Sequence, residues 1–227
     1  MPNLNGTENP PRFPFFSPTK DELNCYIYSR VINSIVKGPP MKNLILVIGR
    51  SGSGKDTLVR HAQTVFGASA IPSYTDRPIR PSETDGVEHT FLTKEGFTAL
   101  LEREEPFAYT QIGETGYRYC TTVEMLSKID ADVVFYVIDP KGYYFCKKFA
   151  DRFNMKVIYV STDEEIRKVR ANMRNGDSAT WAKRTEDENA QFDEFEHDKP
   201  WDAIVFNNGE VDEAKTAFVE AVKSIIE

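Results

Sequence analysis

The stretch "LILVIGRSGSGKDT", Leu44 to Thr57, decides how this chain folds. Its first five residues are apolar, and they are followed by three glycines within six positions and then by Lys55. Such an apolar run is typical of a strand buried in a parallel sheet, and the residues from Thr57 to Phe66 have the composition of a helix. A strand, a glycine-rich turn and a helix in this order predict a phosphate-binding loop of the pattern G-x-x-x-x-G-K-[ST].

The glycines give this loop its chemistry. Gly49, Gly52 and Gly54 allow the backbone to turn tightly, so that successive N–H groups point at an anion. Lys55 adds a cation, and the start of the following helix also favours negative charge. The loop residues that we expect to hold the phosphates of ATP are Arg50, Ser51, Gly52, Ser53, Gly54, Lys55, Asp56 and Thr57.

Asp56 occupies the position at which the loop pattern has a hydroxyl that meets the metal. Thr57, one residue later, still supplies a hydroxyl. A carboxylate beside a triphosphate is repulsive unless a cation lies between them, and carboxylates are among the hard oxygen ligands that Mg²⁺ binds. We therefore predict a magnesium site that uses Asp56 and Thr57.

Strand and helix patterns alternate along most of the remaining chain. Buried strands are expected at residues 43–49, 70–75, 132–139, 155–162 and 201–208, and helices at 57–66, 142–153, 163–174, 179–192 and 211–226. This alternation predicts an α/β fold of three layers, in which a parallel sheet lies between helices. Residues 76–129 interrupt the alternation with short strand-like pieces, which we interpret as a small inserted lobe.

Residues 1–40 differ from the rest because they hold seven of the 13 prolines. We interpret them as a flexible extension of a domain that covers residues 41–227. Within the extension, apolar residues at helical spacing predict a short amphipathic helix over residues 21–37. This helix would dock on the domain, meet a partner, or do neither.

The composition of the 227-residue chain excludes several functions. Its net charge is −7 and it has no block of Lys or Arg, which argues against nucleic-acid binding. The longest apolar run has six residues, too few to span a bilayer, and the N-terminus lacks the pattern of a signal peptide. The three cysteines are scattered without disulfide or metal spacing. We therefore expect a cytoplasmic protein that does not bind membranes.

Arg77 and Arg80 are three residues apart and lie beside prolines that stiffen their loop. Two guanidinium groups at this spacing can grip a phosphate with paired hydrogen bonds, although arginines in a loop can also simply face solvent. A second anion site beside a triphosphate site indicates transfer of a phosphoryl group between two bound molecules. Such a transfer needs no general base, because the attacking phosphate oxygen is already anionic.

The stretch "SYTDRPIRPSETDGVEHTF", Ser73 to Phe91, resembles the guanylate kinase pattern S-x-x-T-R-P-x-R-x-x-E-x-(N/D)-G-x-(D/E)-Y-x-F, with Asp76 for the threonine and His89 for the tyrosine. Four later stretches resemble further motifs of that family in the same order: "GYRYCTT", "IDPKG", "VRANMRNG" and "VFNN". The resemblance implies an ATP-dependent kinase that converts GMP or dGMP to GDP or dGDP with Mg²⁺. It implies small-molecule nucleotides as partners, and a monomer or homodimer.

The resemblance also implies a role for each matching residue. Those implied to hold the acceptor monophosphate are Arg77, Arg80, His89 and Tyr119. Those implied to border its base are Ser73, Thr121 and Asp139. Those implied to act in catalysis are Lys55 and, from a small helical lid over about residues 170–184, Arg170, Arg174 and Arg184. Asn207 is implied to lie near the ATP base.

The residues expected to read guanine depart from the family pattern. The glutamate of the family falls here at Ala108 or Tyr109, and Gln111 or Glu114 could take its place. At the acceptor phosphate, His89 can still donate a hydrogen bond, more strongly when protonated. Two alternatives stay open: a kinase for another nucleoside monophosphate or a ribose bisphosphate-type acceptor, and a binding module without catalysis.

A further departure concerns the metal. Val137 stands where the family has the first aspartate of its D-x-D, at a strand end where an acid usually supports Mg²⁺ beside the loop hydroxyl. The chain thus lacks one acid at Val137 and has another at Asp56. We hypothesise that Asp56 replaces both partners of the usual hydroxyl–carboxylate pair.

Overall fold

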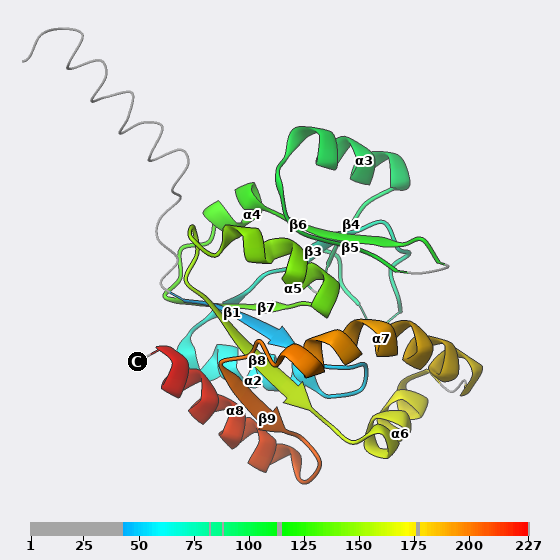
Figure 1. Cartoon of the computed structure of the whole chain (residues 1–227). Coiled ribbons are helices and arrows are strands. Elements are labelled where there is room, and N and C mark those ends of the chain that lie inside the picture. The colour runs from blue at the N-terminus through cyan, green and yellow to red at the C-terminus, as the bar shows by residue number, and fades with distance from the viewer. Residues whose placement is uncertain (1–42, 82, 88, 113–114, 176–177, 227) are drawn as a thin grey trace, which may run out of the picture. The chain divides into compact units, whose positions relative to one another are not determined.

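The structure, a computed structural model, describes residues 43–81, 83–87, 89–112, 115–175 and 178–226. The extension expected over residues 1–40 and its helix lie outside this range. In the described part, one sheet has the strand order β2-β7-β1-β8-β9, and all of its pairings are parallel (Figure 1). Its strands are β1 (Asn43–Ile48), β2 (Ser69–Ala70), β7 (Val133–Val137), β8 (Met155–Ser161) and β9 (Ala203–Phe206).

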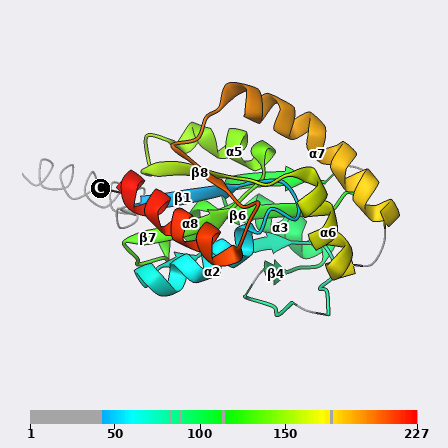
Figure 2. The same cartoon turned by 90° about the horizontal axis from the view of Figure 1, so that it is seen from below.

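The central strand β1 is buried on both faces, as its apolar run predicts. Leu44, Leu46 and Ile48 face a core that includes side chains of two helices, α5 (Pro140–Cys146) and α7 (Ser178–Asp198). Ile45 and Val47 face a second core, formed with α2 (Lys55–Phe66) and α8 (Val211–Ile226). Figure 2 shows the two helix pairs on opposite sides of the sheet. The predicted three-layer α/β fold is confirmed.

A second, smaller sheet lies where the sequence indicates an insertion. Its strand order is β4-β3-β6-β5, with β3 and β4 parallel and the other pairings antiparallel. The strands are β3 (Ser73–Thr75), β4 (His89–Phe91), β5 (Pro106–Gln111) and β6 (Arg118–Thr122). The helix α3 (Lys94–Arg103) lies beside this sheet, and the short helix α4 (Val123–Ser127) follows it (Figure 1).

The strand expected over residues 70–75 is wrong as a single element. Ala70 pairs with Phe135 in the first sheet, whereas Tyr74 pairs with Cys120 in the second. Between them lies Pro72, which has no N–H to donate to a ladder and therefore ends the first strand. This break carries the chain from one sheet to the other, so that both sheets border the same cavity.

The remaining helices match the expected order. α6 (Glu164–Asn175) follows β8, and α7 continues to Asp198, six residues beyond the expected end at Phe192. A short 3-10 turn (Lys147–Phe149) extends α5. Among the described helices, none is long and apolar enough to cross a membrane.

The structure explains why an aspartate stands at position 76. The Asp76 side chain is 1% exposed, and its carboxylate accepts hydrogen bonds of 2.7 Å from both the backbone N–H and Nε of Arg118. The guanidinium of Arg118 also donates to Thr98 Oγ1 and to the Lys94 carbonyl, and it lies 4.6 Å from the centre of the Phe97 ring. The ion pair therefore fastens α3 to the sheet of the inserted lobe.

Removing the carboxylate at this position should destabilise the lobe. In Asp76→Ala, the largely buried Arg118 loses its counter-charge, which typically costs about 3 kcal/mol. Urea unfolding followed by circular dichroism measures the change. A matched control is Glu124→Ala, which removes an exposed helix pair with Lys128 and should leave the unfolding midpoint almost unchanged. Equal effects of the two variants would contradict a structural role for the buried pair.

Candidate functional site

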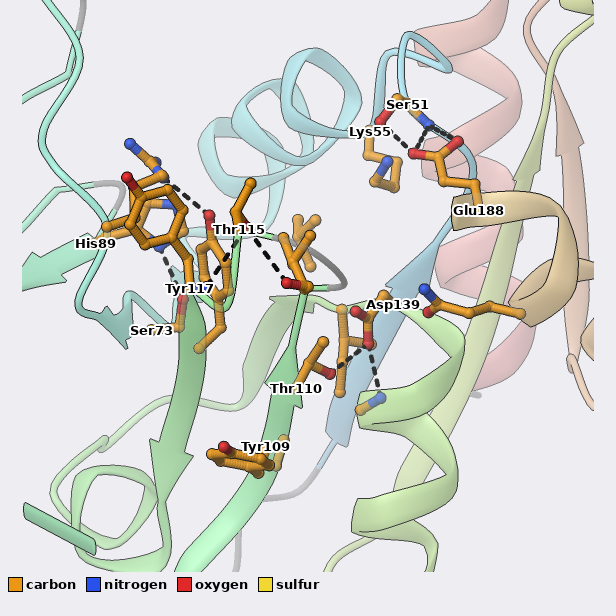
Figure 3. A pocket seen from close by; sticks show the side chains of 18 of the residues that line it. Ser51, Lys55, Ser73, His89, Tyr109, Thr110, Thr115, Tyr117, Asp139 and Glu188 are labelled. Carbon is orange, nitrogen blue, oxygen red and sulfur yellow. Dashed lines mark hydrogen bonds between the residues drawn. The ribbon is translucent and has the colours of Figure 1, made fainter. Parts of the chain in front are cut away.

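A cavity of 980 Å³ lies between the phosphate loop, the second sheet and α7 (Figure 3). The loop contributes Gly49, Ser51 and Lys55 to its wall. The predicted acceptor residues that line the same cavity are Ser73, Arg77, Arg80, His89, Tyr119 and Asp139. The cavity therefore brings together residues expected for donor and for acceptor, although they lie up to 90 positions apart in the chain.

Close packing dictates the glycines of the phosphate loop. Gly52 and Gly54 have φ angles of 79° and 87°, which favour glycine. A Cβ atom on Gly52 would lie 2.7 Å from the carbonyl oxygen of Arg167, and one on Gly54 would lie 2.5 Å from Nδ2 of Asn207. The loop thus lies directly against the first turns of α6 and the end of β9, and no larger residue fits there.

Several buried polar atoms lie around the phosphate loop. Asn207 Nδ2 donates to the Ser53 carbonyl at 2.8 Å, and a guanidinium nitrogen of Arg170 lies nearby. Within the described residues, no partner bonds the buried atoms Ser53 Oγ, Asn207 Oδ1 and Arg170 Nη1. Buried polar atoms normally have partners, so this cluster indicates a place for a polar ligand such as a nucleotide.

Lys55 folds back over the loop that precedes it. Its ammonium donates to the Gly49 carbonyl at 2.6 Å and to the Arg50 carbonyl at 3.2 Å. The cation thus lies at the wall that the loop shares with the acceptor residues. Of the other residues expected to assist it, Arg174 lies in α6 and Arg184 in α7, and their side chains lie outside the described part of the structure.

Asp56 and Thr57 are exposed in the first turn of α2. In the described part of the chain, no three side chains of His, Cys, Asp or Glu converge as a metal site. Mg²⁺ usually keeps several waters and phosphate oxygens and takes one or two protein ligands, so an exposed carboxylate and hydroxyl at a phosphate loop suit this ion. Val137 lies at the end of β7 and presents an apolar side chain to the cavity.

Arg77 is held by the chain itself. Its guanidinium makes two hydrogen bonds with the Glu83 carboxylate, at 2.7 and 2.8 Å, and Nε donates to the Tyr119 hydroxyl at 2.9 Å. The bond from Arg77 lowers the pKa of Glu83 to about 2, so this carboxylate stays ionised. Arg80 is half exposed, and its backbone N–H donates to Glu83. Glu83 therefore fixes the two arginines next to each other.

Asp139 begins α5 and faces the cavity from the end of β7. Its Oδ1 accepts hydrogen bonds from the Gly142 N–H at 2.7 Å and from Thr110 Oγ1 at 2.8 Å. Burial raises the pKa of this carboxyl group, while the two hydrogen bonds oppose the rise. Thr110 is a positioning residue that the sequence patterns did not reveal, because it acts on a side chain 29 positions away.

The other residues expected at the acceptor base differ in how they lie. Ala108 and Tyr109, the two positions at which the family glutamate falls, both line the cavity. Thr121 is fully buried and donates to the Tyr136 hydroxyl, and it does not reach the cavity wall. Gln111 is exposed and donates to the Gly116 carbonyl, whereas Glu114 lies outside the described residues.

Comparison with known proteins agrees with this geometry. The family model described as guanylate kinase matches residues 41–227. The chain belongs to the guanylate kinase family.

Guanylate kinases from several organisms resemble the chain over different lengths. That of Helicobacter hepaticus is 25% identical over 81% of this chain and 92% of its own, and that of Chromohalobacter salexigens is 28% identical over 70% and 76%. Guanylate kinase 2, chloroplastic/mitochondrial, of Oryza sativa subsp. japonica is 40% identical, but over 33% of this chain and 27% of its own length. The crystal structure of guanylate kinase from Anaplasma phagocytophilum shares the fold, with a TM-score of 0.59 at 19% identity over 82% of this chain and 87% of its own.

In this member of the guanylate kinase family, α7 makes two contacts with the phosphate loop that the sequence patterns did not reveal. The first is made by Glu188, whose carboxylate accepts from the Ser51 N–H at 3.0 and 3.1 Å and from the Ser51 hydroxyl (Figure 3). Arg167, which is buried, lies 3.9 Å from the same carboxylate. An anionic group of the chain thus takes a backbone donor of a loop built for phosphate.

The second contact is made by Arg50. Its guanidinium forms a two-bond ion pair with Glu196, with both distances at 3.0 Å, donates to Asn189 Oδ1 at 2.7 Å and lies over the Phe192 ring. Burial opposes ionisation of Glu196, but the bonds from Arg50 and Tyr159 outweigh it and lower the pKa. The side chain of Arg50 therefore anchors α7, which leaves the backbone of this residue for the predicted contact with ATP.

Neutralising Glu188 should strengthen ATP binding. In Glu188→Gln, the side chain keeps its size but no longer places a negative charge against the Ser51 N–H, so the phosphates meet less competition and less repulsion. We expect the Kd for ATP, measured by isothermal titration calorimetry, to fall roughly fivefold. Glu194→Gln, an exposed position on the same helix, is the matched control. Weaker or unchanged ATP binding by Glu188→Gln would contradict the competition.

Proposed function

We propose that this protein transfers the γ-phosphoryl group of ATP to GMP or dGMP, giving GDP or dGDP. The observation that carries the proposal is that the phosphate loop with Lys55 and the cluster of Arg77, Arg80 and Tyr119 line one cavity. Membership of the guanylate kinase family and the names of the similar proteins support GMP as the acceptor.

The proposed reaction depends on position and charge. An anionic oxygen of the acceptor monophosphate attacks the γ-phosphorus of ATP, a new P–O bond forms, and the bond to the β,γ-bridging oxygen breaks. Arg80, Tyr119 and His89 would orient the acceptor phosphate beside Arg77. Lys55 and Arg170, with Arg174 and Arg184, would stabilise the charge that spreads over the transferring group.

The proposed cofactors are ATP and Mg²⁺. Backbone N–H groups of the loop would bind the phosphates, and Asn207 would lie near the ATP base. Asp56 and Thr57 would hold Mg²⁺, which when bound neutralises phosphate charge. Asp139 and Ser73 would border the acceptor base together with Thr121 behind them.

Two alternatives remain as outcomes of the tests. The first is a kinase for another acceptor, such as another nucleoside monophosphate or a ribose bisphosphate. It is tested because Ala108 and Tyr109 line the cavity at the place of the family glutamate. A binding module without catalysis would not need Lys55 against the loop or Arg170 at Gly54, so their positions support an enzyme.

We further propose a cytoplasmic monomer or homodimer with a domain of residues 41–227 after an N-terminal extension. The buried thiols of Cys120 and Cys146, which form no disulfide in the structure described, suit a reducing compartment. The negative net charge of the chain supports small nucleotides rather than nucleic acid as partners.

Turnover with a panel of acceptors tests the function. We expect ADP formation from ATP and Mg²⁺ with GMP and dGMP and little with AMP, CMP, UMP or ribose bisphosphate. Lys55→Ala should lower kcat at least about 100-fold, because the cation acts on the transferring group. Lys223→Ala, an exposed lysine of α8, is the control. ATP binding without turnover of any acceptor would instead support the binding module.

A second experiment tests the metal ligands. Asp56→Ser should lower Mg²⁺-dependent activity about tenfold, because the loop then offers no carboxylate. Adding Val137→Asp should restore part of the loss by returning an acid at the end of β7. Activity is measured across a range of Mg²⁺ concentrations, which separates weaker metal binding from a slower transfer. A neutral Asp56→Ser would show that the carboxylate is a bystander.

A further inference from the structure

Ser73 and His89 form a pair on the wall of the cavity. They are directly opposite each other on the parallel strands β3 and β4. The Ser73 Oγ lies 2.8 Å from Nδ1 of His89, and both residues line the cavity (Figure 3). The resemblance to guanylate kinases implies that Ser73 borders the acceptor base, but in this structure its hydroxyl bonds to the histidine.

Aromatic neighbours hold the imidazole ring in place. The ring meets Phe91 edge to face, with centroids 5.8 Å apart, and Tyr119 in a similar way at 5.5 Å. Tyr119 is in turn fixed by the hydrogen bond that it accepts from Arg77. These contacts restrict the position of the ring. With Nδ1 bonded to Ser73, Nε2 is the nitrogen that is left for a ligand.

The charge around the ring favours its neutral form. Burial and the nearby Arg77 lower the pKa of His89, and Arg80 acts in the same direction. Glu83 on the same loop and Asp56 on α2 oppose this effect. Tyr119 faces the ring from β6. At neutral pH the imidazole thus carries one N–H, and only a proton on Nε2 would let it donate to an anion.

We infer that Ser73 is a positioning residue that donates its hydroxyl to Nδ1 of His89 and so keeps the imidazole proton on Nε2, where it donates to an oxygen of the acceptor phosphate. The inference rests on the proposed function, since it assigns His89 to the monophosphate of that same site. Ser73 would still border the base, as proposed above, but its hydroxyl would act on His89.

A hydroxyl suits this task because it can donate or accept. When the ring is neutral, Ser73 donates to Nδ1. When the ring is protonated, Nδ1–H donates to Ser73 instead, and Nε2–H still faces the phosphate. In Ser73→Ala the neutral ring divides between its two tautomers, and the form with a lone pair on Nε2 repels a phosphate oxygen. The protonated ring is unaffected, because both of its nitrogens carry protons.

The pH dependence of the KM for GMP tests the inference. The ratio of KM between Ser73→Ala and wild type should be roughly fivefold to tenfold at pH 8 and should fall toward one as the pH drops through the pKa of His89, which a ¹⁵N titration of the wild type locates. Ser73→Thr keeps a hydroxyl and should restore the wild-type profile. In a His89→Gln background, Ser73→Ala should have no further effect on KM. A ratio that is the same above and below the pKa of His89, or that persists without His89, would overturn the inference.

A measurement without turnover separates this inference from the proposed function. The ¹⁵N shifts of the imidazole nitrogens report which one carries the proton, and His89→Gln assigns the signal among the three histidines of the chain. With inorganic phosphate at pH 8, wild type should show the proton on Nε2 and Ser73→Ala a mixture. A wild-type proton on Nδ1 would overturn the inference even if GMP is phosphorylated. The expected shifts would support it even if GMP is not.

Discussion

Close backbone contact at Gly52 and Gly54 is the constraint on which the site depends. The strand β1 is paired with β7 on one side and β8 on the other. The loop that follows it therefore emerges between two neighbouring strands, at the carboxyl ends of the parallel strands. The carbonyl of Arg167 lies close to where a Cβ of Gly52 would be, and the side-chain amide of Asn207 close to where a Cβ of Gly54 would be. The start of α6 and the end of β9 therefore pack directly against the loop. This contact also places Arg170 and the buried side-chain amide of Asn207 beside the loop.

Carboxylates of the chain hold several of the described arginines in and near the cavity. Glu83 binds Arg77 with two hydrogen bonds, Glu196 does the same for Arg50, and Asp76 pairs with Arg118 behind the lobe. An arginine that already donates in this way loses less side-chain freedom when a phosphate arrives, but it also has fewer N–H groups to offer. We therefore regard Arg77 as a fixed positive charge. The side chain of Arg80 is half exposed and can more easily adjust to bind an anion.

Local patterns predict the part of this structure that is built from neighbours in the sequence. The apolar run of β1, the glycine turn and α2 follow from residues within about 20 positions of one another, and the two arginines of the lobe loop from spacing alone. The ion pair of Arg50 with Glu196 spans 146 positions, and the bond from Ser51 to Glu188 spans 137. Such contacts leave no periodic trace in the sequence, because Glu188 and Glu196 are two of many polar residues on α7 and their partners lie in a distant loop.

In the proposed reaction, the acceptor base would meet fewer polar groups than the family pattern implies. Among the described residues assigned to it, Ser73 bonds to His89, and Thr121 is buried against Tyr136. Asp139 remains, with Thr110 and the start of α5 fixing one of its oxygens so that the other is the one left for a ligand. In the proposed reaction, most polar contacts with the acceptor would then be made to its phosphate, by Arg80, Tyr119 and His89. A site of this kind would hold any acceptor well by its phosphate and select the base mainly through one carboxylate.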